Sequence, residues 1–181
     1  MCNPQTGHTA AGFPSSEMGH IWMIGMMGTG KTTVGALVAE QLTRPFADLD
    51  TEIMVHTGRT IPELFQAGEE RFREMESMVL ARLAEGEPSV ISTGGGSILR
   101  PSNVDIMRRT GTLVLLTAST AEISDRIGIA VDRPLATGTS ALSDLATSRD
   151  ASYEDAADAT VDTDGKSPDS VAEEVVACSV T

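Results

Sequence analysis

The chain has 181 residues, of which 40% are hydrophobic and 22% are charged, and its formal net charge is −13. This length suits one domain with one core, and the composition is that of a globular protein and not of a disordered one. So negative a chain excludes nucleic acid and anionic membranes as expected partners, because both are bound through broad positive surfaces.

Residues 1–19 are rich in Pro, Gly, Ser and Thr without apolar periodicity, which predicts a flexible tail that stays outside the fold. One domain is then expected over residues 20–181. Its first strand is predicted at 21–25, and a helix is predicted from Lys31 onward. The apolar residues of this helix follow helical spacing: Val34, Leu37, Val38 and Leu42.

A second strand is expected to run into Asp48 and Asp50, whose side chains would then leave the backbone on opposite sides. Helical segments are predicted after Thr51 and Ile61. A longer helix is predicted over about 69–84. One of its faces is apolar: Phe72, Met75, Val79 and Leu83.

A third strand, 89–93, ends in three glycines, and a fourth, 112–117, is apolar on both faces, as expected of a strand buried between helix layers. Ser119 and Glu122 form a capping-box pattern that predicts a helix over about 120–127. The polar segment that follows, rich in Gly and Ala, is expected to be a mobile loop.

Helical segments are expected through Arg149 and Tyr153, then a fifth strand at 159–162 and a C-terminal helix that begins at Ser167-Pro168. Strands that alternate with helices in this way predict an α/β fold of three layers, with helices on both faces of a five-stranded parallel sheet. In such folds, ligands bind at the carboxyl ends of the strands.

The segment Gly-Met-Met-Gly-Thr-Gly-Lys-Thr, residues 25–32, fits the phosphate-binding loop pattern of G, four residues, G, K and then S or T. Its glycines let backbone N–H groups point at a phosphate, beside the positive end of the helix that begins there. Lys31 would place a charge on the β and γ phosphates, and Thr32 would offer a hydroxyl to Mg²⁺. A chance glycine turn is the alternative, and the position between a strand and a helix argues against it.

Seven segments, taken in chain order, make the chain similar to the shikimate kinase family over about residues 21–165. They are the phosphate loop, Asp48-Leu49-Asp50, Thr57-Gly58-Arg59, Phe72-Arg73, Gly94-Gly95-Gly96, Arg133-Pro134-Leu135, and Arg149 before Tyr153. The resemblance implies a P-loop fold like that of nucleoside monophosphate kinases, with a mobile lid at about 128–140. It also implies transfer of the γ-phosphoryl group of ATP to the 3-hydroxyl of shikimate, a step of aromatic amino acid biosynthesis.

The resemblance implies a role for each residue of the nucleotide site. ATP would be bound by Gly28, Thr29, Gly30, Lys31, Thr32, Thr33, Arg126 and Arg133. Within this set Arg126 would stack on the adenine, and Arg133 would reach the transferring phosphoryl group from the lid. Asp48 would hold Mg²⁺ through water, beside Thr32.

The acceptor site is likewise implied by resemblance. Shikimate would be bound by Asp50, Arg73, Gly94, Gly95, Gly96 and Arg149. The two arginines would grip its carboxylate, which suits the planar guanidinium fork, and Asp50 would orient or deprotonate the acceptor hydroxyl. Lys31, Asp50 and Arg133 would form the catalytic set. For Arg73 the alternative is an ion pair on a solvated helix face, among the surrounding glutamates.

Two other functions remain open at this stage. One is a kinase for another polyol or cyclitol acid, such as a gluconate-like substrate. The other is a nucleotide-binding paralogue with weak or lost turnover, because the stretch from Arg133 to Arg149 is a few residues shorter than expected for shikimate kinases.

A location in the cytoplasm is expected, because the longest apolar runs fall far short of the roughly 20 residues of a membrane span and no secretion signal is apparent. The chain is also expected to be a monomer. Cys2 and Cys178 show no spacing typical of a metal site or a disulfide framework, so neither thiol is expected to have a structural role.

Overall fold

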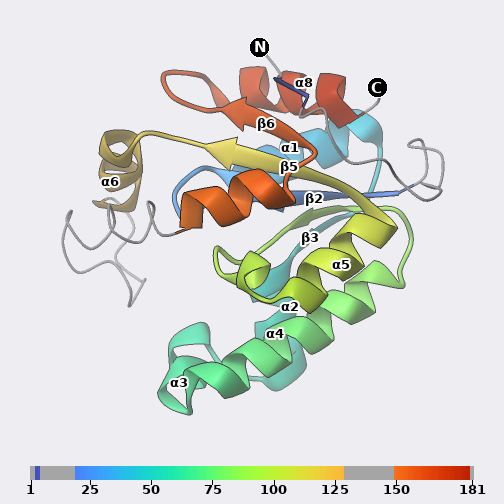
Figure 1. The fold of residues 1–181 in the computed structure, drawn as a ribbon, viewed down its shortest axis with the longest axis vertical. Coiled ribbons are helices and arrows are strands. Elements are labelled where there is room, and N and C mark those ends of the chain that lie inside the picture. The colour runs from blue at the N-terminus through green and yellow to red at the C-terminus, as the bar shows by residue number, and fades with distance from the viewer. Residues whose placement is uncertain (1–2, 5–18, 129–148, 180–181) are drawn as a thin grey trace.

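The computed structural model describes residues 3–4, 19–128 and 149–179, which form a twisted sheet between two layers of helices (Figure 1). The strand order is β1-β6-β5-β2-β4-β3. Five of these strands run parallel: β2 (His20–Ile24), β3 (Phe46–Asp48), β4 (Val90–Ser92), β5 (Gly111–Thr117) and β6 (Ala159–Asp162). The predicted five-stranded parallel sheet is therefore confirmed.

A sixth strand, β1 (Asn3–Pro4), pairs antiparallel with the outer edge of β6. It falls in the segment predicted to be a tail, where no strand was expected. The neighbouring residues 1–2 and 5–18 lie outside the described part of the chain.

Helices cover both faces of the sheet, as predicted for a three-layer fold. On one face α1 (Lys31–Leu42) packs against α8 (Pro168–Ser179). The other face is covered by α2 (Leu49–Thr57), α4 (Glu69–Ala84) and α5 (Pro101–Thr110). Smaller elements complete the fold: α3 (Ile61–Gln66), η1 (Ser97–Leu99), α6 (Thr120–Gly128) and a helical segment at 149–156. None of the helices in the described ranges is long and apolar enough to cross a membrane.

The central strands are apolar on both sides because each side meets a helix layer. Trp22 and Ile24 of β2 are buried in the core shared with α2, α4 and α5, whereas Ile21 and Met23 are buried in the core shared with α1 and α8. This alternation follows from the two-residue period of a strand.

Two of the predicted helices are capped by the serine side chains that the sequence indicated. The N–H of Glu122 donates to the Ser119 hydroxyl at 3.3 Å at the start of α6. The N–H of Ser170 donates to the Ser167 hydroxyl at 3.2 Å at the start of α8. Each bond satisfies a backbone donor that the first turn of a helix leaves without a partner.

Helix α5 was not predicted, although its first residue is Pro101, a residue type favoured at the first helical position. A second difference concerns Cys178 in α8, which is disulfide-bonded. The prediction of a thiol without a structural role is therefore wrong for Cys178, whereas Cys2 lies outside the described residues.

Candidate active site

A cavity of about 960 Å³ opens at the carboxyl ends of the parallel strands, and it brings together most of the predicted site residues. The predicted residues among its lining are Gly28, Gly30, Lys31, Thr32, Thr33, Asp48, Asp50, Arg73, Gly94, Gly95, Gly96, Arg126 and Arg149. Thr29 is buried inside the phosphate loop instead. Arg133 and residues 129–140 of the predicted lid lie outside the described residues.

The phosphate loop follows β2 and curls because glycines occupy its special backbone positions. Gly28 and Gly30 have φ values of 81° and 93°. A Cβ atom on Gly25 would lie 2.4 Å from the carbonyl oxygen of Leu116, so no other residue fits there without a shift of the backbone. The Thr29 hydroxyl donates to the Met26 carbonyl at 2.8 Å and closes the loop from inside.

Lys31 is nearly buried at the start of α1, and its side chain reaches back into the loop. Its ammonium group donates to the carbonyl oxygens of Gly25 and Met26, each at 2.8 Å. These bonds hold the charge at the place where the loop N–H groups and the N-terminus of α1 favour an anion. A phosphate that enters the loop would compete with these carbonyls for the ammonium group.

Thr32 and Asp48 face one another across the entrance of the loop. The Thr32 hydroxyl donates to Oδ2 of Asp48 at 2.7 Å and lies 3.4 Å from the hydroxyl of Ser92. These oxygen donors fit Mg²⁺, which takes few protein ligands and completes its shell with water and phosphate oxygens. No cluster of three or more His, Cys, Asp or Glu side chains suited to a metal occurs among the described residues.

Asp50 does not extend a strand, so the prediction that Asp48 and Asp50 alternate along one strand is wrong. Strand β3 ends at Asp48, whose Oδ1 accepts the N–H of Thr51 at 3.1 Å and caps α2. This cap turns the chain into the helix at once, and Asp50 lies in its first turn. There Oδ1 of Asp50 would be 3.2 Å from a Cβ atom on Gly94, so the carboxylate faces the glycine turn.

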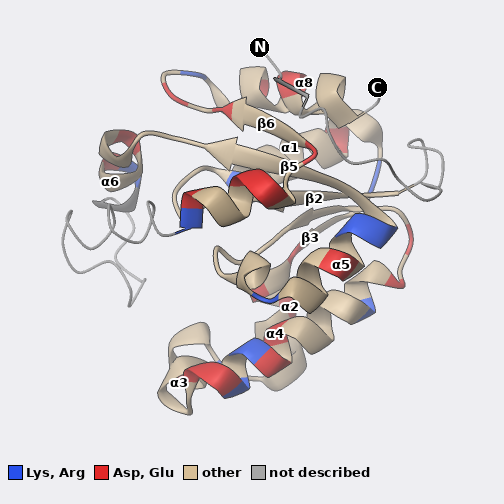
Figure 2. Cartoon of the chain, in the orientation of Figure 1, with Lys and Arg blue, Asp and Glu red and all other residues tan. Residues whose placement is uncertain are grey.

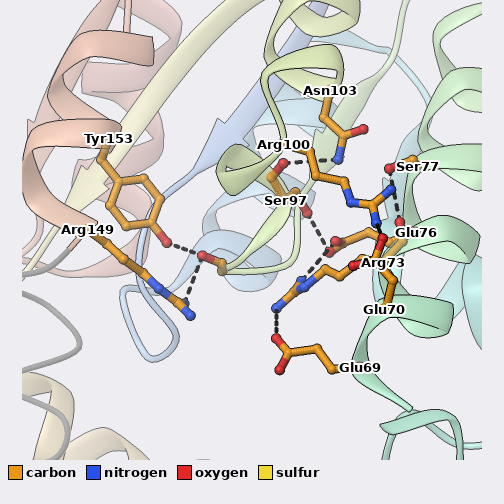
Figure 3. A network of polar contacts seen from close by, with 11 residues as sticks. Glu69, Glu70, Arg73, Glu76, Ser77, Ser97, Arg100, Asn103, Arg149 and Tyr153 are labelled. Atoms are coloured by element: carbon orange, nitrogen blue, oxygen red, sulfur yellow. Dashed lines mark hydrogen bonds and ion pairs between the residues drawn. The ribbon is translucent and has the colours of Figure 1, made fainter. Parts of the chain in front are cut away.

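Arg73 of α4 is held by buried groups and does not lie on a solvated helix face (Figure 3). Its guanidinium donates to Oε2 of Glu76 at 2.8 Å, and Oε1 of Glu76 accepts the Ser97 hydroxyl at 2.7 Å. The exposed Glu69 lies 3.6 Å away. The alternative of an ion pair on a solvated helix face is therefore wrong for Arg73, because its main partner, Glu76, is completely buried.

The glycine turn after β4 lies directly against this ion pair. A Cβ atom on Gly96 would be 2.3 Å from the Arg73 guanidinium, and one on Gly94 would be 2.7 Å from Oε1 of Glu76. Side chains at these two positions would displace both charged groups, which explains why a chain that builds this site needs glycine here.

Arg149 approaches the same turn from the opposite side (Figure 3). Its guanidinium donates to the Gly95 carbonyl at 3.3 Å, and the buried hydroxyl of Tyr153 donates to that carbonyl as well. Burial raises the pKa of Tyr153 to about 12, although the nearby Arg149 opposes this shift. Arg73 and Arg149 thus flank the turn with two guanidinium groups.

Arg126 connects α6 with the end of β6 and with the phosphate loop. Its guanidinium donates to the hydroxyl and the carbonyl of Thr163, at 3.0 Å and 3.1 Å, and to Glu122 at 2.9 Å. A longer contact of 3.4 Å reaches the carbonyl of Gly28. These partners fix where the guanidinium borders the cavity.

The cavity gathers four cations in an otherwise acidic protein: Lys31, Arg73, Arg126 and Arg149. Acidic and basic residues elsewhere are spread over the helices of both layers (Figure 2). Two residues that hold the site in place were not predicted from the sequence: Glu76, which binds Arg73, and Tyr153, which binds the Gly95 carbonyl. Their spacing could have indicated them, because residues three or four apart on a helix share a face. Arg73 and Glu76 are such a pair, and so are Arg149 and Tyr153.

Comparison with known proteins identifies relatives over nearly the whole chain. Residues 27–179 match the family model of shikimate kinase. The shikimate kinase of Symbiobacterium thermophilum is 42% identical over 163 residues, which cover 87% of this chain and 94% of that protein. The shikimate kinase of Pseudomonas syringae pv. tomato is 38% identical over 164 residues, with coverages of 88% and 95%.

Solved structures give the same result. The shikimate kinase from Acinetobacter baumannii, solved in complex with shikimate, matches with a TM-score of 0.84 at 35% identity and covers 88% of this chain and 91% of its own. A gluconokinase from Sinorhizobium meliloti has a TM-score of 0.59 at 20% identity, with coverages of 89% and 91%, which shows a likeness of fold alone.

Proposed function

The chain belongs to the shikimate kinase family, and on that premise we propose that it transfers the γ-phosphoryl group of ATP to the 3-hydroxyl of shikimate. Members of this family are ATP-dependent kinases. The observation that carries the proposal is that one cavity contains Lys31 of the phosphate loop together with Arg73 and Arg149. A site for a nucleotide's phosphates thus adjoins a site for an organic anion.

On the acceptor side, Arg73 and Arg149 bind the carboxylate of shikimate through paired N–H groups, which match a carboxylate in shape and charge. Glu76 holds the Arg73 side chain in the orientation that this requires. Asp50 lies beside the glycine turn, where its carboxylate accepts a hydrogen bond from the reacting hydroxyl and orients or deprotonates it.

On the donor side, the loop backbone and Lys31 bind the β and γ phosphates, with Lys31 exchanging its bonds to Gly25 and Met26 for phosphate oxygens. Thr32 and Asp48 would hold Mg²⁺, whose charge would offset that of the phosphates. Phosphoryl transfer needs mainly alignment and charge neutralisation from a protein.

The remaining residues of the proposed nucleotide site complete this arrangement. Thr33 lines the cavity beside the loop, and Thr29 shapes the loop. Arg126, which lines the same cavity, would lie against the adenine. Arg133 and the lid at about 128–140 are proposed to close over the reaction and exclude water, which would otherwise accept the phosphoryl group.

The same proposal includes a monomer in the cytoplasm, without nucleic acid or membrane partners. The net charge of −13 supports the absence of anionic partners. In the described part of the chain the exposed large apolar side chains are Val55, Met78 and Leu99, which lie on three different elements. Single apolar residues of this kind are normal on the surface of a monomer.

The test is a coupled assay of ADP release with Mg²⁺ and ATP, in which shikimate and gluconate are compared as acceptors at millimolar concentration. We expect ADP release that depends on shikimate. Release with gluconate but not with shikimate would refute the assigned acceptor. ATP binding without ADP release that depends on shikimate would identify a paralogue without turnover.

A further inference from the structure

Tyr153, the single tyrosine of the chain, links three segments that are distant in sequence. It is 2% exposed and lies in the helical segment 149–156. Its hydroxyl donates to the carbonyl of Gly95 and has a longer contact of 3.9 Å with the sulfur of Met26. One side chain thus touches the glycine turn and the phosphate loop. It comes from the same helix as Arg149 (Figure 3).

The Gly95 carbonyl accepts two donors, because Arg149 also donates to it at 3.3 Å. A carbonyl oxygen has two lone pairs and can serve both. The Arg149 bond is longer than the usual 2.9–3.0 Å, about where such bonds begin to weaken. It is therefore the bond that yields when the guanidinium turns to a carboxylate, whereas Tyr153 does not line the cavity and keeps its partner.

The position of Gly95 matters because the turn packs on the backbone of the phosphate loop. A Cβ atom on Gly95 would lie 3.5 Å from the amide nitrogen of Met27 and 3.7 Å from the carbonyl oxygen of Gly25. Both the turn and the loop border the cavity. A shift of Gly95 would therefore change the distance between the acceptor site and the donor site.

We propose that Tyr153 is a positioning residue: its hydroxyl fixes the Gly95 carbonyl, and this carbonyl holds the Arg149 guanidinium ready for the carboxylate of the acceptor. The inference rests on the proposed function of the site. Burial keeps the phenol protonated, because the pKa of Tyr153 is raised to about 12. The hydroxyl therefore remains a donor throughout the neutral pH range.

The variant Tyr153→Phe tests this role, because it removes only the hydroxyl group. Loss of one neutral hydrogen bond corresponds to about a three- to tenfold change, and we expect KM for shikimate to rise by about this factor. KM for ATP should stay within about twofold, because the phosphate loop keeps its own bonds. The matched control is Ser179→Ala, which removes another buried hydroxyl, bonded to the Val176 carbonyl at 3.1 Å in α8.

A rise of KM for both substrates, or an unchanged KM for shikimate, would overturn the proposal. Either result would mean that the Tyr153 hydroxyl has no specific effect on the acceptor site. The control should leave both KM values unchanged. If Ser179→Ala changed KM for shikimate as strongly as Tyr153→Phe does, the effect would be general loosening and the proposal would fail.

A second measurement uses the wild-type sequence and does not depend on turnover. Incorporation of 3-fluorotyrosine gives a single fluorine resonance, since Tyr153 is the chain's one tyrosine. Shikimate should shift this resonance saturably as Arg149 changes partner at Gly95. A resonance that stays in place at saturating shikimate overturns the inference. A shifted resonance without ADP release would support it while refuting the proposed transfer.

Discussion

Replacing Glu76 by glutamine would test the buried ion pair behind the acceptor site. Glu76 is 0% exposed, and its carboxylate accepts bonds from Arg73 at 2.8 Å and from Ser97 at 2.7 Å. A glutamine has nearly the same shape but only one acceptor oxygen. Either Arg73 or Ser97 would therefore point its N–H or O–H group at the amide N–H group of the glutamine. Among the described residues, the ion pair left to the Arg73 charge would be the one with the exposed Glu69, 3.6 Å away.

The expected loss follows from this geometry. Breaking a buried ion pair by removing one charge costs about 3–5 kcal/mol. The amide keeps one hydrogen bond, worth about 0.5–1.5 kcal/mol, so we expect the free energy of unfolding to fall by about 2–4 kcal/mol. At about 2–4 °C per kcal/mol for a chain of this size, Tm should fall by roughly 5–15 °C.

The assay is thermal and urea unfolding followed by circular dichroism, with Glu70→Gln as the matched control. Glu70 lies in the same helix and pairs with Arg100, but its side chain is 79% exposed. An exposed pair contributes about 0–1 kcal/mol, so Tm of the control should fall by no more than about 4 °C. Equal Tm values for the two variants would refute the argument that burial makes the Glu76 pair strong.

Three further predictions concern the site as a whole. Arg149→Lys removes one charged hydrogen bond to the carboxylate and should weaken shikimate binding by roughly ten- to hundredfold while sparing ATP, measured as KM. Lys31→Ala should depress ADP release with any acceptor. Burial raises the pKa of Tyr153 from 10.0 to about 12, so its stabilising contribution is complete below about pH 10 and is lost as the pH rises toward 12, which the tyrosinate absorbance of folded and urea-unfolded protein would show.

Each of these predictions has an outcome that contradicts it. Unchanged shikimate affinity would remove Arg149 from the acceptor site. Full activity of Lys31→Ala would reject the assignment of the phosphate loop. Tyrosinate absorbance that appears near pH 10 in the folded protein would mean that the hydroxyl of Tyr153 is open to water, against its burial in the structure.

Local sequence patterns predicted most of the fold because they report local physics. The glycine pattern of residues 25–32 and the doubly apolar strand at 112–117 depend on neighbours within a few residues, and both are confirmed as a loop and a strand. The prediction for Asp50 was wrong because an aspartate such as Asp48 occurs both within a strand end and as the N-cap of a helix. Here Asp48 is the N-cap, because its carboxylate accepts the N–H of Thr51. The Asp-x-Asp pattern alone does not distinguish the two cases.

Glu76 shows what the sequence could not reveal. Four glutamates surround Arg73 in α4, and their sequence is equally compatible with a solvated face. Which one becomes buried depends on Ser97, which approaches from 21 positions away in the chain. Tyr153 is similar, because its partner Gly95 lies 58 positions away. Contacts over such separations are set by the assembled sheet and not by local spacing.

The strand order also determines when the phosphate loop can form as the chain folds. Met23 of β2 pairs with Ser92 on one side and with Val114 on the other. A nascent chain in which β4 has left the ribosome but β5 has not therefore lacks one of the two strands that flank β2 and support the phosphate loop. Pairings of this sequence separation fold slowly and leave apolar strand edges exposed meanwhile. We therefore expect that no N-terminal fragment ending before β5 binds ATP.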